Sequence, residues 1–152
     1  MNIQIICLGT LKEEYLKIAQ EDLLGKILKK NRVTGVNVLE LKEEPLKENA
    51  SEATILKALD MEGQRILEKL PGKGRIICLD IQGRKASHEY FAGLFDGMDR
   101  LGEKDLTVII GGSHGISDTV KRKAERISFS RLTYPHQLFR IAVLDALALY
   151  LH

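Results

Sequence analysis

Residues 106–115 read Leu106-Thr107-Val108-Ile109-Ile110-Gly111-Gly112-Ser113-His114-Gly115, an apolar run that stops at a group of glycines. Consecutive apolar and β-branched residues predict a strand that is buried on both faces, which is typical of a parallel sheet. Glycines directly after such a strand allow the backbone to approach a ligand closely. The stretch therefore favours an α/β fold that binds a ligand at the carboxyl ends of its strands.

The rest of the chain repeats this arrangement of a short apolar run followed by a helical pattern. Periodicity predicts strands over residues 3–8, 36–41, 75–80, 106–110 and 127–132, and helices over 12–30, 51–70, 87–95, 117–126 and 135–150. Parallel strands that are joined by helices are covered on both faces. The order βαβαβαβαβα therefore predicts a single α/β domain over residues 1–152, with a mostly parallel sheet and helices on both faces.

Side chains at the expected helix ends support these boundaries. Ser51 and either Ser117 or Asp118 are predicted N-caps, because a short polar side chain there accepts an unpaired backbone N–H. Pro135 is predicted to open the last helix, where its missing N–H has no partner. In the first helix, the spacing predicts an inward face made of Tyr15, Ile18, Ala19, Leu23 and Ile27.

The composition of the 152 residues is that of a globular protein. Hydrophobic residues make up 44% and charged residues 29%, which argues against disorder. No apolar run reaches the ~20 residues that a membrane span needs, and the first residues lack the features of a signal peptide. Cys7 and Cys78 each lie in an apolar run, which predicts buried thiols in a reducing compartment. We therefore expect a cytoplasmic protein.

Unusual residues gather after three of the predicted strands. They fill residues 79–83, 111–115 and 129–136. Ligands of open parallel sheets bind beyond these carboxyl ends, where free backbone groups can contact an adenine or a ribose. The glycine loop has neither the GxGxxG nor the GxxxxGK[ST] spacing, so it is no dinucleotide or P-loop fingerprint. The alternative interpretation is a tight turn into a capped helix.

The formal net charge of +2 excludes a strongly basic coat but not a local basic patch. Between residues 119 and 140 the only acidic residue is Glu125, whereas the basic residues are Lys121, Arg122, Lys123, Arg126, Arg131 and Arg140. Such a segment beside a nucleotide-like pocket suits a polyanion such as RNA. The alternative is a solvated helix face.

The histidines predict no metal site, because no two of them have metal-ligand spacing and HExxH is absent. His136 follows Pro135 at a helix start, where it either contacts a ligand or caps and packs the helix. His114 lies in the glycine loop, where it is either a site residue or a turn residue. No GxSxG nucleophile motif occurs.

Three segments together carry a family resemblance. They are Leu79-Asp80-Ile81-Gln82-Gly83, residues 108–117, and residues 127–140 with their Ser-Phe-Ser and Tyr-Pro-His-Gln-Leu blocks. In these segments the chain resembles the bacterial 23S ribosomal RNA pseudouridine N3-methyltransferases of the SPOUT superfamily. The similarity extends from Met1 to about Leu144.

The resemblance implies a SPOUT α/β knot, in which a C-terminal trefoil knot forms the cofactor pocket. It also implies S-adenosyl-L-methionine as cofactor, a homodimer, no metal, and 23S rRNA within the ribosome as the substrate. The cofactor contacts implied by the resemblance are Leu79, Gly111, Phe129, Ser130, Arg131, Leu132, Thr133 and Tyr134.

The expected reaction is methyl transfer to N3 of a pseudouridine, whose imide proton must leave. Arg140, as a nearby cation, and His136, as a base, are the candidate catalytic residues. The family ends in a Tyr-His-basic tail that this sequence lacks. The alternative is therefore a cofactor-binding but catalytically impaired relative that acts as an RNA-binding module or a structural dimer.

Overall fold

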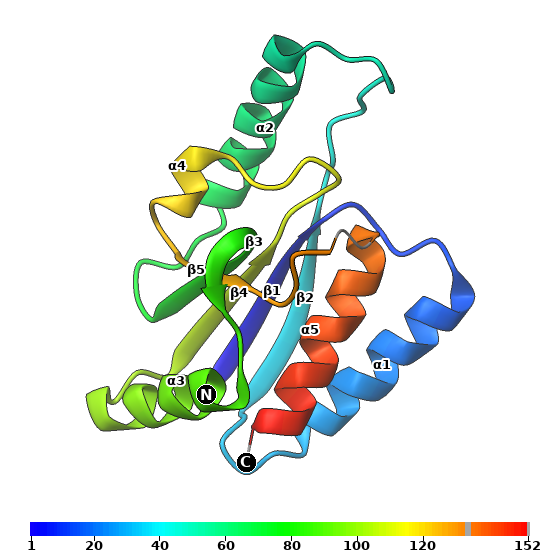
Figure 1. Cartoon of the computed structure of the whole chain (residues 1–152). Coiled ribbons are helices and arrows are strands. Elements are labelled where there is room, and N and C mark those ends of the chain that lie inside the picture. The colour runs from blue at the N-terminus through cyan, green and yellow to red at the C-terminus, as the bar shows by residue number, and fades with distance from the viewer. Residues whose placement is uncertain (133–134, 152) are drawn as a thin grey trace.

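The computed structural model describes residues 1–132 and 135–151, in which strands and helices alternate in the predicted order (Figure 1). The strands are β1 (Asn2–Leu8), β2 (Gly35–Leu41), β3 (Arg75–Lys85), β4 (Asp105–Ile110) and β5 (Glu125–Ser128). The helices are α1 (Glu14–Leu28), α2 (Glu52–Leu67), α3 (His88–Leu101), α4 (Asp118–Lys121) and α5 (His136–Tyr150).

The five strands form one sheet in the order β2-β1-β4-β3-β5, and every pairing is parallel. Strand β1, which lies inside the sheet beside the central strand β4, pairs on one side with β2, where Ile5 lies opposite Val38, and on the other with β4, where Ile5 lies opposite Val108. The predicted α/β class is confirmed. All carboxyl ends of the strands therefore lie at one edge of the sheet.

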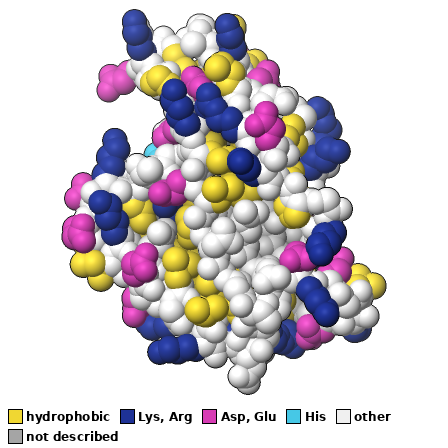
Figure 2. Space-filling view, turned by 180° about the vertical axis from the view of Figure 1, so that it is seen from behind, with side chains coloured by type: hydrophobic (Ala, Val, Ile, Leu, Met, Phe, Trp, Pro, Cys, Tyr) yellow, Lys and Arg dark blue, Asp and Glu magenta, His cyan; other side chains and the backbone are white. Residues whose placement is uncertain are grey.

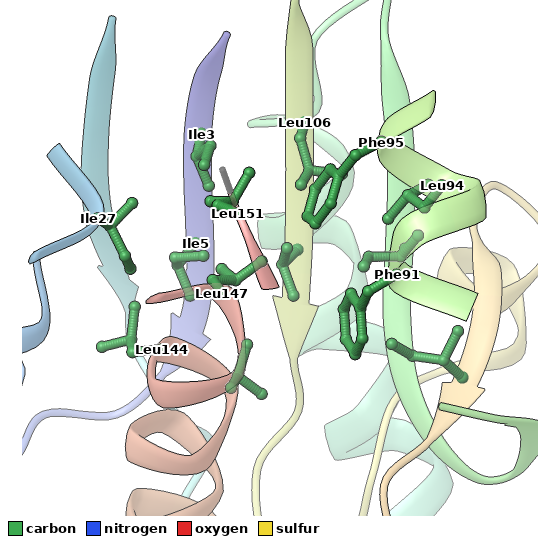
Figure 3. Packing of buried hydrophobic residues seen from close by; sticks show 14 of the residues in the cluster. Ile3, Ile5, Ile27, Phe91, Leu94, Phe95, Leu106, Leu144, Leu147 and Leu151 are labelled. Atoms are coloured by element: carbon green, nitrogen blue, oxygen red, sulfur yellow. The ribbon is translucent and has the colours of Figure 1, made fainter. Parts of the chain in front are cut away.

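Helices cover both faces of this sheet. The side chains of β1 alternate, so that Ile3 and Ile5 pack with α1, α3 and α5, whereas Ile6 and Leu8 pack with α2 and α4. Figure 3 shows the first of these layers, in which Phe91 and Phe95 of α3 and Leu144, Leu147 and Leu151 at the end of α5 meet the sheet. This face carries the larger core.

Three predicted helix ends are confirmed. The hydroxyls of Ser51, Ser87 and Ser117 accept the backbone N–H of the residue three positions later in α2, α3 and α4. Pro135 immediately precedes α5. Helix α3 is longer than the short helix that we predicted, because it continues to a left-handed cap at Gly102.

The predicted helix over 117–126 is wrong beyond its first turn. Helix α4 ends at Lys121, and the chain then enters β5, where Glu125 and Arg126 lie opposite Ile77 and Cys78 of β3. The predicted strand over 127–132 correspondingly begins earlier and ends at Ser128. Pairing with β3 overrides the local helical pattern at these residues.

The predicted inward face of α1 is only partly correct. Leu23 and Ile27 are buried, but Tyr15 is 63% and Ile18 62% exposed, and Leu16 is buried in their place. Because Ile18 is two residues from Leu16, it points to nearly the opposite side of the helix. Helix α1 packs against the neighbouring α5 as well as the sheet edge, which changes the side it buries.

Strand β3 continues past the predicted end at residue 80 and is irregular there. Its register with β5 shifts between Leu79 and Arg84, and both residues lie opposite Ile127. A Cβ at Gly83 would lie 2.6 Å from the backbone carbon of Arg126, so only glycine fits this crossing. The segment 80–83 therefore bulges out at the carboxyl end of β3 and returns along β5.

Candidate functional site

The three strand ends that the sequence singled out line one cavity of about 860 Å³. Its lining residues include the later part of β3, the end of β4 and the loop after it, the end of β5 and the first turn of α5. A cavity of this volume accommodates a nucleoside-sized ligand. The topology positions this site, because parallel strands bring loops that are far apart in the sequence to the same edge.

The walls of the cavity combine apolar side chains with exposed backbone. Its apolar lining consists of Leu79, Ile81, Ile110, Ile116, Ile127, Phe129 and Phe139. The backbone groups come from the glycine loop 111–115 and from residues 128–130. Flat apolar walls beside backbone N–H and C=O groups suit an adenine ring and a ribose.

Glycine is required at position 111. A Cβ there would lie 2.5 Å from the carbonyl oxygen of Gly115 and 2.6 Å from Cγ1 of Ile116. The loop also turns at Gly115, whose φ of 89° favours glycine. The loop thus folds back on itself at the floor of the cavity, and residue 111 must lack a side chain for it to close.

The structure brings together only part of the predicted cofactor set. Leu79, Gly111, Phe129 and Ser130 line the cavity. Arg131 and Leu132 are exposed and do not line it. Thr133 and Tyr134 lie outside the described residues.

Two hydrogen bonds of serine hydroxyls stabilise the turn at the end of β5, which forms one wall of the cavity. The Ser128 hydroxyl donates to the carbonyl of Ser130 at 3.2 Å, and the Ser130 hydroxyl accepts the backbone N–H of Leu132 at 3.0 Å. These bonds hold the backbone at residues 128–132 after β5 has ended.

Asp80 pairs with two of the predicted RNA-binding cations at the cavity rim. Its carboxylate lies 3.5 Å from Lys121 and 3.5 Å from Arg126, and it accepts the backbone N–H of Gln82 at 3.1 Å. On the face seen in Figure 2, Lys and Arg side chains are interspersed with Asp and Glu. The positive charge of residues 119–126 is therefore partly balanced within the protein.

Arg140 is buried beside the cavity but does not line it. Its side chain is 2% exposed, and its guanidinium donates to Glu40 at 2.6 Å, to Gln20 at 3.3 Å and to the carbonyl of Gly9 at 3.1 Å. These partners belong to β2, α1 and the turn after β1. Arg140 thus fastens α5 to the carboxyl edge of the sheet.

His136 lines the cavity and faces Glu43, a residue that the sequence analysis did not single out. Nε2 of His136 lies 3.7 Å from Oε2 of Glu43. Oε1 of Glu43 accepts hydrogen bonds from the backbone N–H and the hydroxyl of Ser113, at 3.3 and 3.2 Å. In the sequence, Glu43 is one acid in the charged run 42–44, which carries no signal of a site.

Other ionisable groups near the sheet are buried outside the cavity. Burial raises the pKa of Glu62, and repulsion by Glu43 adds to the effect, although a hydrogen bond from the backbone N–H of Glu44 opposes it. Cys7 and Cys78 are the buried thiols that we predicted, and burial raises the pKa of Cys7 to about 12 and that of Cys78 to about 11.

Within residues 1–132 and 135–151 no cluster of His, Cys, Asp or Glu could hold a metal ion. No helix in the described part of the chain is both long and apolar enough to cross a membrane.

Together, the parallel sheet and the cavity at its carboxyl edge define an α/β protein that binds a small ligand at the ends of β3, β4 and β5. A family model described as "Predicted SPOUT methyltransferase" matches residues 1–148. The chain belongs to the SPOUT methyltransferase family, and its cofactor is accordingly a methyl donor.

Relatives support the same assignment. The chain is 40% identical over 146 residues to the ribosomal RNA large subunit methyltransferase H of Bacillus cytotoxicus, and 41% and 38% identical to the proteins of that name from Listeria monocytogenes and Clostridium novyi. Each alignment covers 95% of this chain and 90% of the relative.

Proposed function

We propose that this protein methylates N3 of a pseudouridine in 23S rRNA of the large ribosomal subunit, with S-adenosyl-L-methionine as the methyl donor. The observation that carries the proposal is the single cavity formed by the three strand ends. The relatives named as large-subunit rRNA methyltransferases support RNA as the substrate. They do not favour a catalytically impaired RNA-binding or structural protein. We also propose that the protein works in the cytoplasm.

The cavity suits S-adenosyl-L-methionine, because its glycine loop exposes backbone where a Cβ would collide with the loop itself. Leu79, Gly111, Phe129 and Ser130, which line the cavity, would hold the cofactor. When bound, the cofactor supplies a methyl group on a sulfonium, which is activated for in-line attack without a metal.

His136 is the proposed proton acceptor for the N3 imide, because it alone of the predicted catalytic pair lines the cavity. Arg140 is proposed to act indirectly, by stabilising the segment beside His136. Its guanidinium holds the carbonyl of Gly9, and a Cβ at Gly9 would lie 3.9 Å from Nε2 of His136. Arg140 therefore stabilises the turn at Gly9, which lies beside the imidazole of His136.

The C-terminal trefoil knot and the homodimer are parts of the same proposal. The crossing of 80–83 over β5, which requires Gly83, supports a knotted C-terminal region. The exposed apolar side of α5 supports a dimer, because Leu149 is 65% exposed beside a shallow hollow lined by Ala142, Ala146 and Tyr150.

The decisive test is mass spectrometry of ribosomal RNA from a strain lacking the gene, with and without complementation. We expect the methyl group on N3 of a pseudouridine to disappear in the deletion strain and to return with the gene. Calorimetry with S-adenosyl-L-homocysteine tests the cofactor separately. Unchanged methylation in the deletion strain would refute the substrate, and absence of heat on titration would refute the cofactor.

A further inference from the structure

Glu43 joins two walls of the cavity without lining it. Its Oε1 holds both polar hydrogens of Ser113 in the glycine loop, and its Oε2 faces Nε2 of His136 in the first turn of α5. The glycine loop and the first turn of α5 are separate segments of the sequence. One carboxylate, carried by the segment after β2, therefore fixes their relative positions.

The backbone around Glu43 leaves room for this carboxylate. A Cβ at Gly112 would lie 2.6 Å from Oε1 of Glu43, and one at Gly9 would lie 3.1 Å from its Oε2. A side chain at residue 112 would therefore displace the carboxylate, and one at residue 9 would crowd it. The space that holds the carboxylate is therefore bounded by the turn after β1 and the loop after β4. This observation does not depend on the hydrogen bonds that Glu43 makes.

We propose that Glu43 is a positioning residue for methyl transfer, which orients His136 with Nε2 toward the carboxylate and Nδ1 toward the substrate. This inference rests on the proposed function. In the step it serves, the N3–H bond of the pyrimidine breaks and the proton moves to Nδ1 of His136. The electron pair stays on N3 and would form the new bond to the methyl carbon, while the bond between that carbon and the sulfonium sulfur would break and its electron pair would leave on the thioether product. A base whose ring is held by a carboxylate is a recurrent arrangement in catalysis.

The charges around Glu43 leave His136 as its partner. Glu44 pairs with Arg65 of α2, and Glu62 of the same helix accepts the backbone N–H of Glu44. The guanidinium of Arg140 is held by Glu40. Among the described residues, His136 is the only side chain within ion-pair distance of Glu43. The separation of 3.7 Å is longer than a hydrogen bond, and catalytic contacts that are long without substrate often tighten when substrate binds.

The substitution Glu43→Gln keeps the contact with Ser113 but changes the contact with His136, so it tests the two contacts of the carboxylate separately. The amide has one accepting oxygen and one donating nitrogen. Ser113 offers two donors, so the oxygen stays with Ser113 and the nitrogen faces His136. Nε2 must then accept, which places the ring proton on Nδ1, the nitrogen that has to receive the substrate proton. Glu43→Ala removes both contacts. Glu48→Gln, an exposed site in the same segment, is the matched control.

The first measurement needs neither cofactor nor RNA. Nitrogen-15 NMR of the neutral imidazole in the full-length protein should show the proton of His136 on Nε2 in the wild type and in Glu48→Gln, and on Nδ1 in Glu43→Gln. Amide exchange at Ser113 should become at least about tenfold faster in Glu43→Ala, because a hydrogen bond to a charged acceptor is lost. It should stay close to wild type in Glu43→Gln.

The second measurement is turnover on 23S rRNA within ribosomes purified from the deletion strain, which lack the methyl group. Glu43→Gln should lower kcat at least about tenfold while KM changes less than about twofold, because only the proton transfer is impaired. A wild-type tautomer or a wild-type kcat in Glu43→Gln would overturn the inference. If the wild type does not methylate this RNA, the proposed function fails, whereas the imidazole and amide measurements still decide whether Glu43 orients His136.

Discussion

Arg140 shows how a buried charge can serve a site that it does not touch. Its three partners, Glu40, Gln20 and Gly9, come from three different elements. A guanidinium is suited to this task, because its planar fork donates in several fixed directions at once. The sequence predicted Arg140 to be a cation that favours loss of the imide proton, and the structure adds that its charge is held inside the protein.

Replacing Arg140 should therefore affect folding as well as turnover. Arg140→Ala should lower the free energy of unfolding by about 3 kcal/mol, because Glu40 loses its charged partner and the Gly9 carbonyl loses the guanidinium donor. Urea unfolding measures this change. The variant should also lose methylation while the folded fraction keeps S-adenosyl-L-homocysteine binding. A change below about 1 kcal/mol would show that the ion pair contributes little.

Glu62 should make stability depend on pH. Burial raises its pKa above the ordinary value of 4.5, so the folded state favours the protonated form. Its contribution to stability is fully present below the ordinary carboxyl pKa and is lost as pH rises through the raised pKa of the folded protein.

Glu62→Gln should therefore match the wild type in acid and exceed its stability at neutral pH. The amide oxygen can still accept the backbone N–H of Glu44, so the hydrogen bond survives. Thermal unfolding from pH 4 to pH 8 measures the difference, with exposed Glu48→Gln as the control. Equal curves for Glu62→Gln and the wild type at every pH would contradict the effect.

At the scale of elements, the glycine loop after β4 is the most constrained piece of the site. Gly111→Ala should weaken S-adenosyl-L-homocysteine binding at least about tenfold, because the new Cβ collides with the carbonyl of Gly115 and the loop must open. Gly93→Ala in α3 is the matched control, since its Cβ would meet nothing within 4 Å.

Calorimetry and thermal unfolding together check this comparison. The α3 variant should bind the ligand normally and gain up to about 1 kcal/mol of stability, as expected for alanine in an exposed helix. Normal binding by Gly111→Ala would mean that the loop does not shape the cofactor pocket.

Most elements were predictable from periodicity, because β1, β4 and the first part of β3 are largely apolar runs, β2 alternates, and α2, α3 and α4 each follow a capping serine. The three strand ends were predictable as one site for the same reason, since parallel strands share an edge. The strand at Glu125 and Arg126 was not predictable, because pairing with β3 decides its conformation. Glu43 was not predictable either, because its partners Ser113 and His136 are distant in the sequence.

At the scale of the whole molecule, the exposed apolar side of α5 bears on the proposed homodimer. Leu149→Glu should shift the protein toward a monomer in sedimentation velocity, because a charge would replace an apolar contact at the subunit boundary. Leu56, which is 54% exposed on α2 at the other face of the sheet, provides the control, and Leu56→Glu should leave the sedimentation coefficient unchanged. Dissociation by both variants, or by neither, would place the boundary elsewhere.

Strand β1 is paired on both sides inside the sheet, which has a consequence for how the chain folds during synthesis. β1 is made first, yet one of its two neighbours, β4, begins only at Asp105, opposite Asn2. Contacts between such distant segments form slowly. The centre of the sheet therefore stays incomplete until about two thirds of the chain has been translated, and the nascent molecule exposes apolar strand surface to the cell's chaperones for most of its production.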